Sequence, residues 1–173
     1  MISLYTATVP AFRQAIAATR GVLAKAAAFA AEHGRDPATL VDARLIADML
    51  PLNYQVQSIA THSVRALDGA RAGEFAPHRA PFPADFAAMD AELAAAEATL
   101  AAVDASEING LMGRDMVFAI GSRRMPYLVE DFLLSFSLPN IYFHATTAYD
   151  ILRVQGVPLG KSDYLGVPRL KAS

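Results

Sequence analysis

Two pairs of polar residues stand out in an otherwise apolar sequence, because each pair has the spacing of one helix face. Asn140 and His144 are four positions apart, and Gln55 and His62 are seven apart. Side chains at these separations project from the same side of an α-helix. An imidazole there can bind a metal ion, or it can hydrogen-bond to a polar side chain across the core. If both faces point inward, the four residues form one polar cluster between two helices.

The donor set of this cluster is weak for a transition metal. A structural zinc site needs four nitrogen or sulfur ligands, and a catalytic one needs three protein ligands and an open position. Amide oxygen suits calcium or magnesium better than zinc or nickel. The candidate metal ligands are His144, Asn140 and His62. This donor set favours a site without a metal over one that binds zinc or nickel. As a binding pocket, the same faces offer Gln55, Asn140 and Thr147, and no catalytic residue can be assigned.

Each member of the cluster also has a purely structural interpretation. The proline before Asn140 removes one helical hydrogen bond, and the Asn140 amide can pair with a carbonyl group freed in the preceding turn. His144 can hydrogen-bond across the core to Gln55 or Tyr54. His62 lies in a polar stretch that we expect to approach the solvent.

The composition describes a globular chain and excludes several classes of site. Of the 173 residues, 54% are hydrophobic and 18% are charged, and the net charge of -2 gives no general attraction to nucleic acid or anionic membranes. The chain has no cysteine, which excludes disulfides, thiolate nucleophiles and thiolate–metal sites. The longest strongly apolar run, residues 132–138, is too short to span a bilayer. We therefore expect a cytoplasmic protein that binds neither nucleic acid nor membrane.

Apolar periodicity predicts four long helices that place the cluster. Residues 1–31 are basic and lack acidic side chains, as in a transit peptide, but their helical spacing favours a first core helix. The helices should cover about residues 10–33, 51–67, 86–103 and 127–155.

Three further features complete the predicted fold. Pro139 should bend the last helix or divide it at Leu138, and the Gly- and Pro-rich residues 69–83 should form a loop. Two short apolar segments flank "GS" at 121–122, which predicts a β-hairpin. The expected fold is an all-α four-helix bundle with a small β-hairpin before the last helix, in a single domain over residues 1–173. The segment "GVPLGKSDYL" should fold back over one end of it.

Three stretches carry a resemblance to a known family: "SLYTATVPAF" (3–12), "DMLPLNYQVQ" (48–57) and "LPNIYFHATTAYDILRVQGVPLGKSDYLG" (138–166). The chain resembles the bacterial domain-of-unknown-function family DUF1993, which is grouped with the DinB/YfiT-like four-helix bundles, a superfamily of metalloenzymes. The resemblance implies zinc or nickel held by three histidines, one from the second helix and two from an H-x-x-x-H pair on the last. That pair falls on Asn140 and His144, so asparagine stands where the first histidine is expected. Superfamily members with assigned activities use the metal to activate small thiols.

Two functions from different classes remain open. The first is a DinB-like protein with a degenerate metal site, either a small-molecule binder or a metal-dependent transferase, with its site between the second and last helices. The second is a non-catalytic, metal-free homodimeric interaction module, in which alanine-rich faces of the first and third helices meet a twofold partner. The first requires an open cavity, whereas in the second we expect the space to be filled by Phe132, Phe136, Tyr142 and Phe143.

Overall fold

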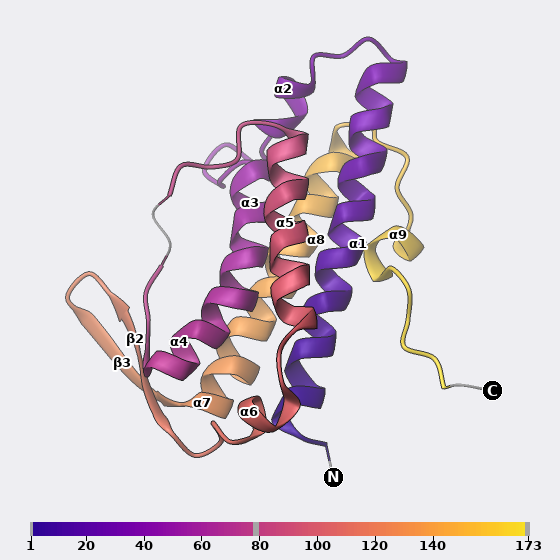
Figure 1. The fold of residues 1–173 in the computed structure, drawn as a ribbon. Coiled ribbons are helices and arrows are strands. Elements are labelled where there is room, and N and C mark those ends of the chain that lie inside the picture. Colours follow the sequence, from indigo (N-terminus) through magenta and orange to yellow (C-terminus); the bar gives the residue numbers. More distant parts are fainter. Residues whose placement is uncertain (1, 78–79, 172–173) are drawn as a thin grey trace.

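The computed structural model describes residues 2–77 and 80–171, most of which are helical. In chain order the elements are helices α1 (Leu4–Glu32), α2 (Pro37–Val41) and α3 (Leu52–Ala60), π-helical turn η1 (Thr61–Arg65), helix α4 (Ala66–Ala72), strand β1 (Glu74–Phe75), helices α5 (Phe86–Ala101) and α6 (Ala105–Asn109), strands β2 (Asp115–Ile120) and β3 (Arg123–Leu128), helix α7 (Val129–Asp131), π-helical segment η2 (Phe132–Ser137), and helices α8 (Leu138–Val154) and α9 (Lys161–Leu165). Helices α1 and α3 each pack against both α5 and α8, and the small sheet lies beside α4 (Figure 1).

Helix α1 begins earlier than its apolar pattern predicts because Ser3 caps it. The Ser3 hydroxyl accepts a hydrogen bond from the backbone N–H of Thr6, which satisfies one of the free donors of the first turn. Pro10 therefore lies inside the helix rather than at its start. Phe12 and Ile16 are fully buried along one face, as expected for a core helix.

The second helical stretch is longer than predicted and changes type along its length. Helix α3 continues through η1 into α4, which ends at Ala72. The next residue, Gly73, caps the helix with its backbone in the left-handed region. The prediction that a loop begins at Gly69 is wrong. Gly69 lies within α4, and a Cβ atom there would come within 2.8 Å of the Phe75 Cβ. This glycine allows β1 to approach the helix closely instead of ending the helix.

A bend or a division was predicted at Leu138, and the helical type changes there while the backbone stays helical through Ser137 and Leu138. Segment η2 ends at Ser137 and α8 begins at Leu138, so Pro139 occupies the first turn of α8. A proline in the first turn costs little, because a helix needs no N–H donor there, and the π-helical segment absorbs the change of backbone pattern.

The predicted hairpin is confirmed, and it belongs to a slightly larger sheet. Strands β2 and β3 pair antiparallel across the turn at Gly121, and β1 adds a parallel strand on the other side of β2. The sequence analysis missed β1, because a strand of two residues is too short to show an alternating pattern.

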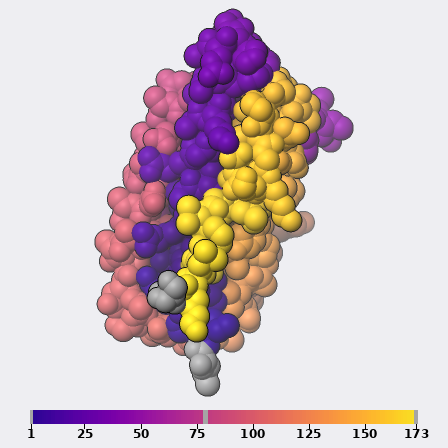
Figure 2. Space-filling view, turned by 90° about the vertical axis from the view of Figure 1, so that its right-hand side faces the viewer, coloured from indigo at the N-terminus to yellow at the C-terminus, as the bar shows by residue number. Residues whose placement is uncertain are grey.

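The C-terminal segment lies along the side of α1 rather than over one end of the helices, which corrects the prediction. Figure 2 shows this yellow segment beside indigo α1. The side chain of Gln14 donates a hydrogen bond to the backbone carbonyl of Leu165, and Lys25 pairs with Asp163. In the part of the chain that the structure describes, no helix has the combined length and apolarity needed to cross a membrane.

Candidate functional site

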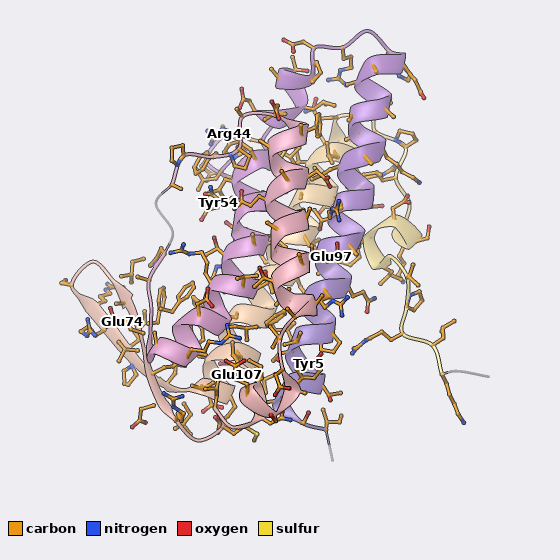
Figure 3. All side chains as sticks on the ribbon, in the orientation of Figure 1. Tyr5, Arg44, Tyr54, Glu74, Glu97 and Glu107 are labelled. Carbon is orange, nitrogen blue, oxygen red and sulfur yellow. The ribbon has the colours of Figure 1, made fainter. Side chains whose placement is uncertain are left out.

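A cavity of about 320 Å³ lies between the second and last helical stretches, beside the small sheet. Its walls are formed by Tyr54, Gln57, Ser58, Thr61, His62, Phe75, Pro77, Phe118, Ile120, Phe136, Asn140, Phe143 and His144. None of these is an aspartate, glutamate, lysine or arginine. Tyr54 projects from α3 on the side of the molecule where Glu74 and the sheet lie (Figure 3). Among the described residues, the cavity wall is therefore polar but carries no permanently charged side chain.

His144 is buried on α8 and contacts the second helical stretch through a hydrogen bond. Its Nδ1 atom lies 2.7 Å from Oε1 of Gln55, and the amide nitrogen of Gln55 donates to the backbone carbonyl of Leu50 over 2.8 Å. The edge of the Tyr54 ring packs against the imidazole, with the centroids 5.8 Å apart. The predicted hydrogen bond from His144 across the core is confirmed, with Gln55 as the partner.

His62 faces His144 from η1. The two imidazole planes are nearly parallel, at 15°, and their centroids are 5.7 Å apart. His62 is half-buried and its ring packs against Phe75 and Phe136, so the prediction that this stretch approaches the solvent holds only in part. Its Nδ1 atom is buried without a hydrogen-bond partner. A buried polar atom of this kind costs about 1–3 kcal/mol, and such atoms are rare in folded proteins.

Both imidazoles are held in the neutral form. Burial lowers the pKa of His144 to about 4, because the charged form loses its hydration. Burial also lowers the pKa of His62 to about 4, and the nearby His144 contributes in the same direction. At pH 7 the cavity therefore presents uncharged nitrogen atoms.

Asn140 takes the structural role that the preceding proline predicts. Its side-chain nitrogen donates a hydrogen bond to the backbone carbonyl of Phe136 over 2.7 Å. This carbonyl lies in η2, next to that of Ser135, which is four positions before Pro139 and loses its helical donor there. Asn140 also lines the cavity, and its Oδ1 atom has no hydrogen-bond partner among the described residues.

The remaining predicted site residues lie outside the cavity wall. Gln55 is placed behind His144 and acts through it. Thr147 is buried on α8, and it does not line the cavity. The sequence analysis missed Ser58 and Thr61, whose hydroxyl groups make no hydrogen bond within the described residues. Ser58 was detectable, since it precedes His62 by four positions and so shares its helix face.

The aromatic residues of the last helical stretch leave the cavity open. Phe132 is fully buried in the core, whereas Phe136 forms part of the cavity wall. Tyr142 and Phe143 are 44% and 55% exposed, so they do not fill the space between the helices. An open cavity is what the small-molecule interpretation requires.

The residues present do not fit a zinc or nickel centre. Within residues 2–77 and 80–171, no cluster contains three histidine, cysteine, aspartate or glutamate side chains placed to hold a metal. His62 and His144 supply two neutral nitrogen donors, and the third candidate, Asn140, supplies a neutral oxygen. Such a set lacks the ligands of a zinc site and leaves a divalent charge uncompensated in a partly apolar cavity.

Comparison with known proteins identifies the family. The family model described as a domain of unknown function, DUF1993, matches residues 4–165. The fold is similar to the crystal structure of a DinB family member from Shewanella denitrificans, with a TM-score of 0.81 and 28% sequence identity over 98% of this chain and 96% of that chain. None of the curated proteins matches the sequence. The chain therefore belongs to the DUF1993 family within the DinB-like superfamily.

Proposed function

We propose that this protein is a cytoplasmic, single-domain, DinB-like four-helix bundle whose cavity binds a small neutral molecule without a metal ion. The packing of α1, α3, α5 and α8 supports the bundle, and the cysteine-free sequence fits a reducing compartment. The observation that carries the binding function is an open cavity whose wall, as formed by residues 2–77 and 80–171, contains no permanently charged side chain.

The cavity wall combines aromatic rings with polar groups, and this combination defines the class of ligand. Phe75, Phe118 and Phe136 present aromatic rings, while hydroxyl, amide and imidazole groups supply hydrogen bonds from the helices. A charged ligand would lose its hydration without meeting an opposite charge, which is costly in a buried site. The volume of about 320 Å³ is near the lower end of the roughly 300–1,000 Å³ that small-molecule sites occupy. The ligand is therefore small, uncharged and partly apolar.

A cavity-filling variant tests this function. Ser58→Leu places a larger side chain in the cavity wall, and Thr146→Leu makes a similar change at an exposed position on α8. Neutral one- and two-ring compounds should raise the melting temperature of the wild type and of Thr146→Leu, but not that of Ser58→Leu. Failure of every compound, or equal effects on the two variants, contradicts binding in this cavity.

A metal-dependent transferase is the second candidate, and one contact favours it. Histidines that bind metals usually donate their other ring nitrogen to a carbonyl or carboxylate oxygen, and Gln55 offers such an oxygen to His144. Elemental analysis of protein purified without a histidine tag separates the two candidates. We expect well under one zinc or nickel per chain. A stoichiometric metal that is lost in His144→Ala and kept in His33→Ala supports the transferase instead.

A metal-free homodimeric module is the remaining candidate. Ala24, Ala27 and Ala87 line a shallow hollow of about 650 Å³ between α1 and α5, where a second chain could pack closely. Sedimentation equilibrium tests this assembly. A dimer that dissociates in Ala24→Glu supports it, whereas a monomeric wild type contradicts it.

A further inference from the structure

A chain of two hydrogen bonds determines which nitrogen of His144 carries the proton. The backbone carbonyl of Leu50 can only accept, so the Gln55 amide must turn its NH₂ group toward it. Oε1 of Gln55 then faces His144, and this oxygen also can only accept. Nδ1 of His144 therefore donates, over 2.7 Å. A neutral imidazole has one N–H group, so Nε2 keeps a lone pair.

Nε2 is the ring nitrogen that His144 can offer to the cavity. His144 lines the cavity while Gln55, its partner at Nδ1, does not. No group among the described residues hydrogen-bonds to Nε2, and this atom is not one of the buried atoms left without a partner. It is therefore an available acceptor at the cavity wall, and Gln55 prevents it from becoming a donor.

From this geometry we infer, given the proposed binding function, that the cavity selects uncharged ring compounds that donate a hydrogen bond from a hydroxyl or ring N–H group to Nε2 of His144. Gln55 is the positioning residue for this selection. The Tyr54 and Phe143 rings stand nearly perpendicular to the imidazole, with centroids 5.8 Å and 5.3 Å from its own, so aromatic rings lie beside His144 at the cavity wall. A ligand that offers only an acceptor leaves Nε2 desolvated and unpaired, which costs binding free energy.

Indole and benzofuran provide a matched pair of probes. They have the same two fused rings, and they differ in having an N–H donor or an oxygen at one position. One neutral hydrogen bond corresponds to a binding preference of about tenfold. Calorimetric titration of the wild type should show indole binding about tenfold more tightly. In Gln55→Leu the preference should fall to roughly twofold or less, because either tautomer of His144 then becomes available.

A control variant separates the positioning role from general changes to the cavity. Gln57 lines the cavity and donates to the carbonyl of Pro81, without touching His144. The preference for indole should survive in Gln57→Leu. Loss of the preference in both variants, or its survival in both, overturns the role of Gln55.

The tautomer itself can be measured without any ligand. Nitrogen-15 spectra of the histidine rings, assigned by the signals lost in His144→Gln, should show a protonated Nδ1 and an unprotonated Nε2 at pH 7. Gln55→Leu should show both tautomers. A protonated Nε2 in the wild type overturns the inference even if both compounds bind. If the wild type shows the expected tautomer but binds indole and benzofuran with equal affinity, the inference is also overturned. If it shows the expected tautomer but binds neither compound, the proposed function fails and the inference fails with it.

Discussion

Acidification should destabilise the folded protein through the two buried imidazoles. Their pKa is about 4 in the folded state, below the value of 6.5 for an exposed histidine. The unfolded chain therefore binds more protons than the folded one between these two values. By linkage, the stability that depends on neutral His62 and His144 is present above pH 6.5 and is lost as the pH falls toward 4.

The size of the effect follows from these values. With a pKa of about 4 when folded and 6.5 when unfolded, each histidine lowers the free energy of unfolding by about 2 kcal/mol between pH 7 and pH 5. The pair therefore contributes roughly 4 kcal/mol by the same linkage relation. Because small domains have total stabilities of about 5–15 kcal/mol, this loss is large enough to measure by chemical denaturation.

Guanidinium denaturation followed by circular dichroism at pH 7 and pH 5 measures the effect. His144→Gln should lose about 2 kcal/mol less than the wild type between the two pH values, because one titrating group has been removed. His33→Gln changes an exposed imidazole at the end of α1 and should leave the difference unchanged. Acidic side chains contribute equally to the variants compared. If a variant lacking both His62 and His144 loses as much stability as the wild type, the buried-imidazole explanation is refuted.

Two further predictions concern close contacts in the fold. Gly69→Ala should lower the unfolding free energy by about 1–3 kcal/mol, because its Cβ would lie 2.8 Å from the Phe75 Cβ, and a raised stability would contradict this. Gly21→Ala is the matched control: nothing lies within 4 Å of its Cβ, so chemical denaturation should show a gain of about 0.5–1 kcal/mol. Asn140→Leu should cost about 1–3 kcal/mol in thermal unfolding, because the Phe136 carbonyl loses its donor, and an unchanged melting temperature would exclude that role.

Local signals were sufficient to predict most of the helical framework. Apolar positions such as Phe12 and Ile16 recur at the helical period and are buried in the core. Pro139 predicted the place where the last stretch changes its helical type, because a proline acts on the hydrogen bonds of its own turn. The signals failed where a contact with a distant segment was decisive. Gly69 was predicted to end the helix, but it lies within the helix and allows Phe75 to approach closely.

The candidate site was predictable only in part. The spacing of Asn140 and His144 showed that they share a face, since that relation depends on one helix alone. The surroundings of His62 could not be obtained in this way, because its ring packs against Phe75 and Phe136, which belong to other elements of the chain. Phe118 comes to the cavity wall from the sheet, and no local pattern in the sequence connects it with either helix.

The sequence by itself determined the helical character, the hairpin, the lack of thiol chemistry and the presence of an imidazole on a polar helix face. These properties depend on residue types and on neighbours within one or two turns. Only the tertiary structure decided that His62 faces His144, that Gln55 controls its proton and that the cavity stays open. These properties depend on groups that are distant in the sequence, such as Gln55 and His144, which are 89 positions apart. Such groups come together only when separate helices pack against each other.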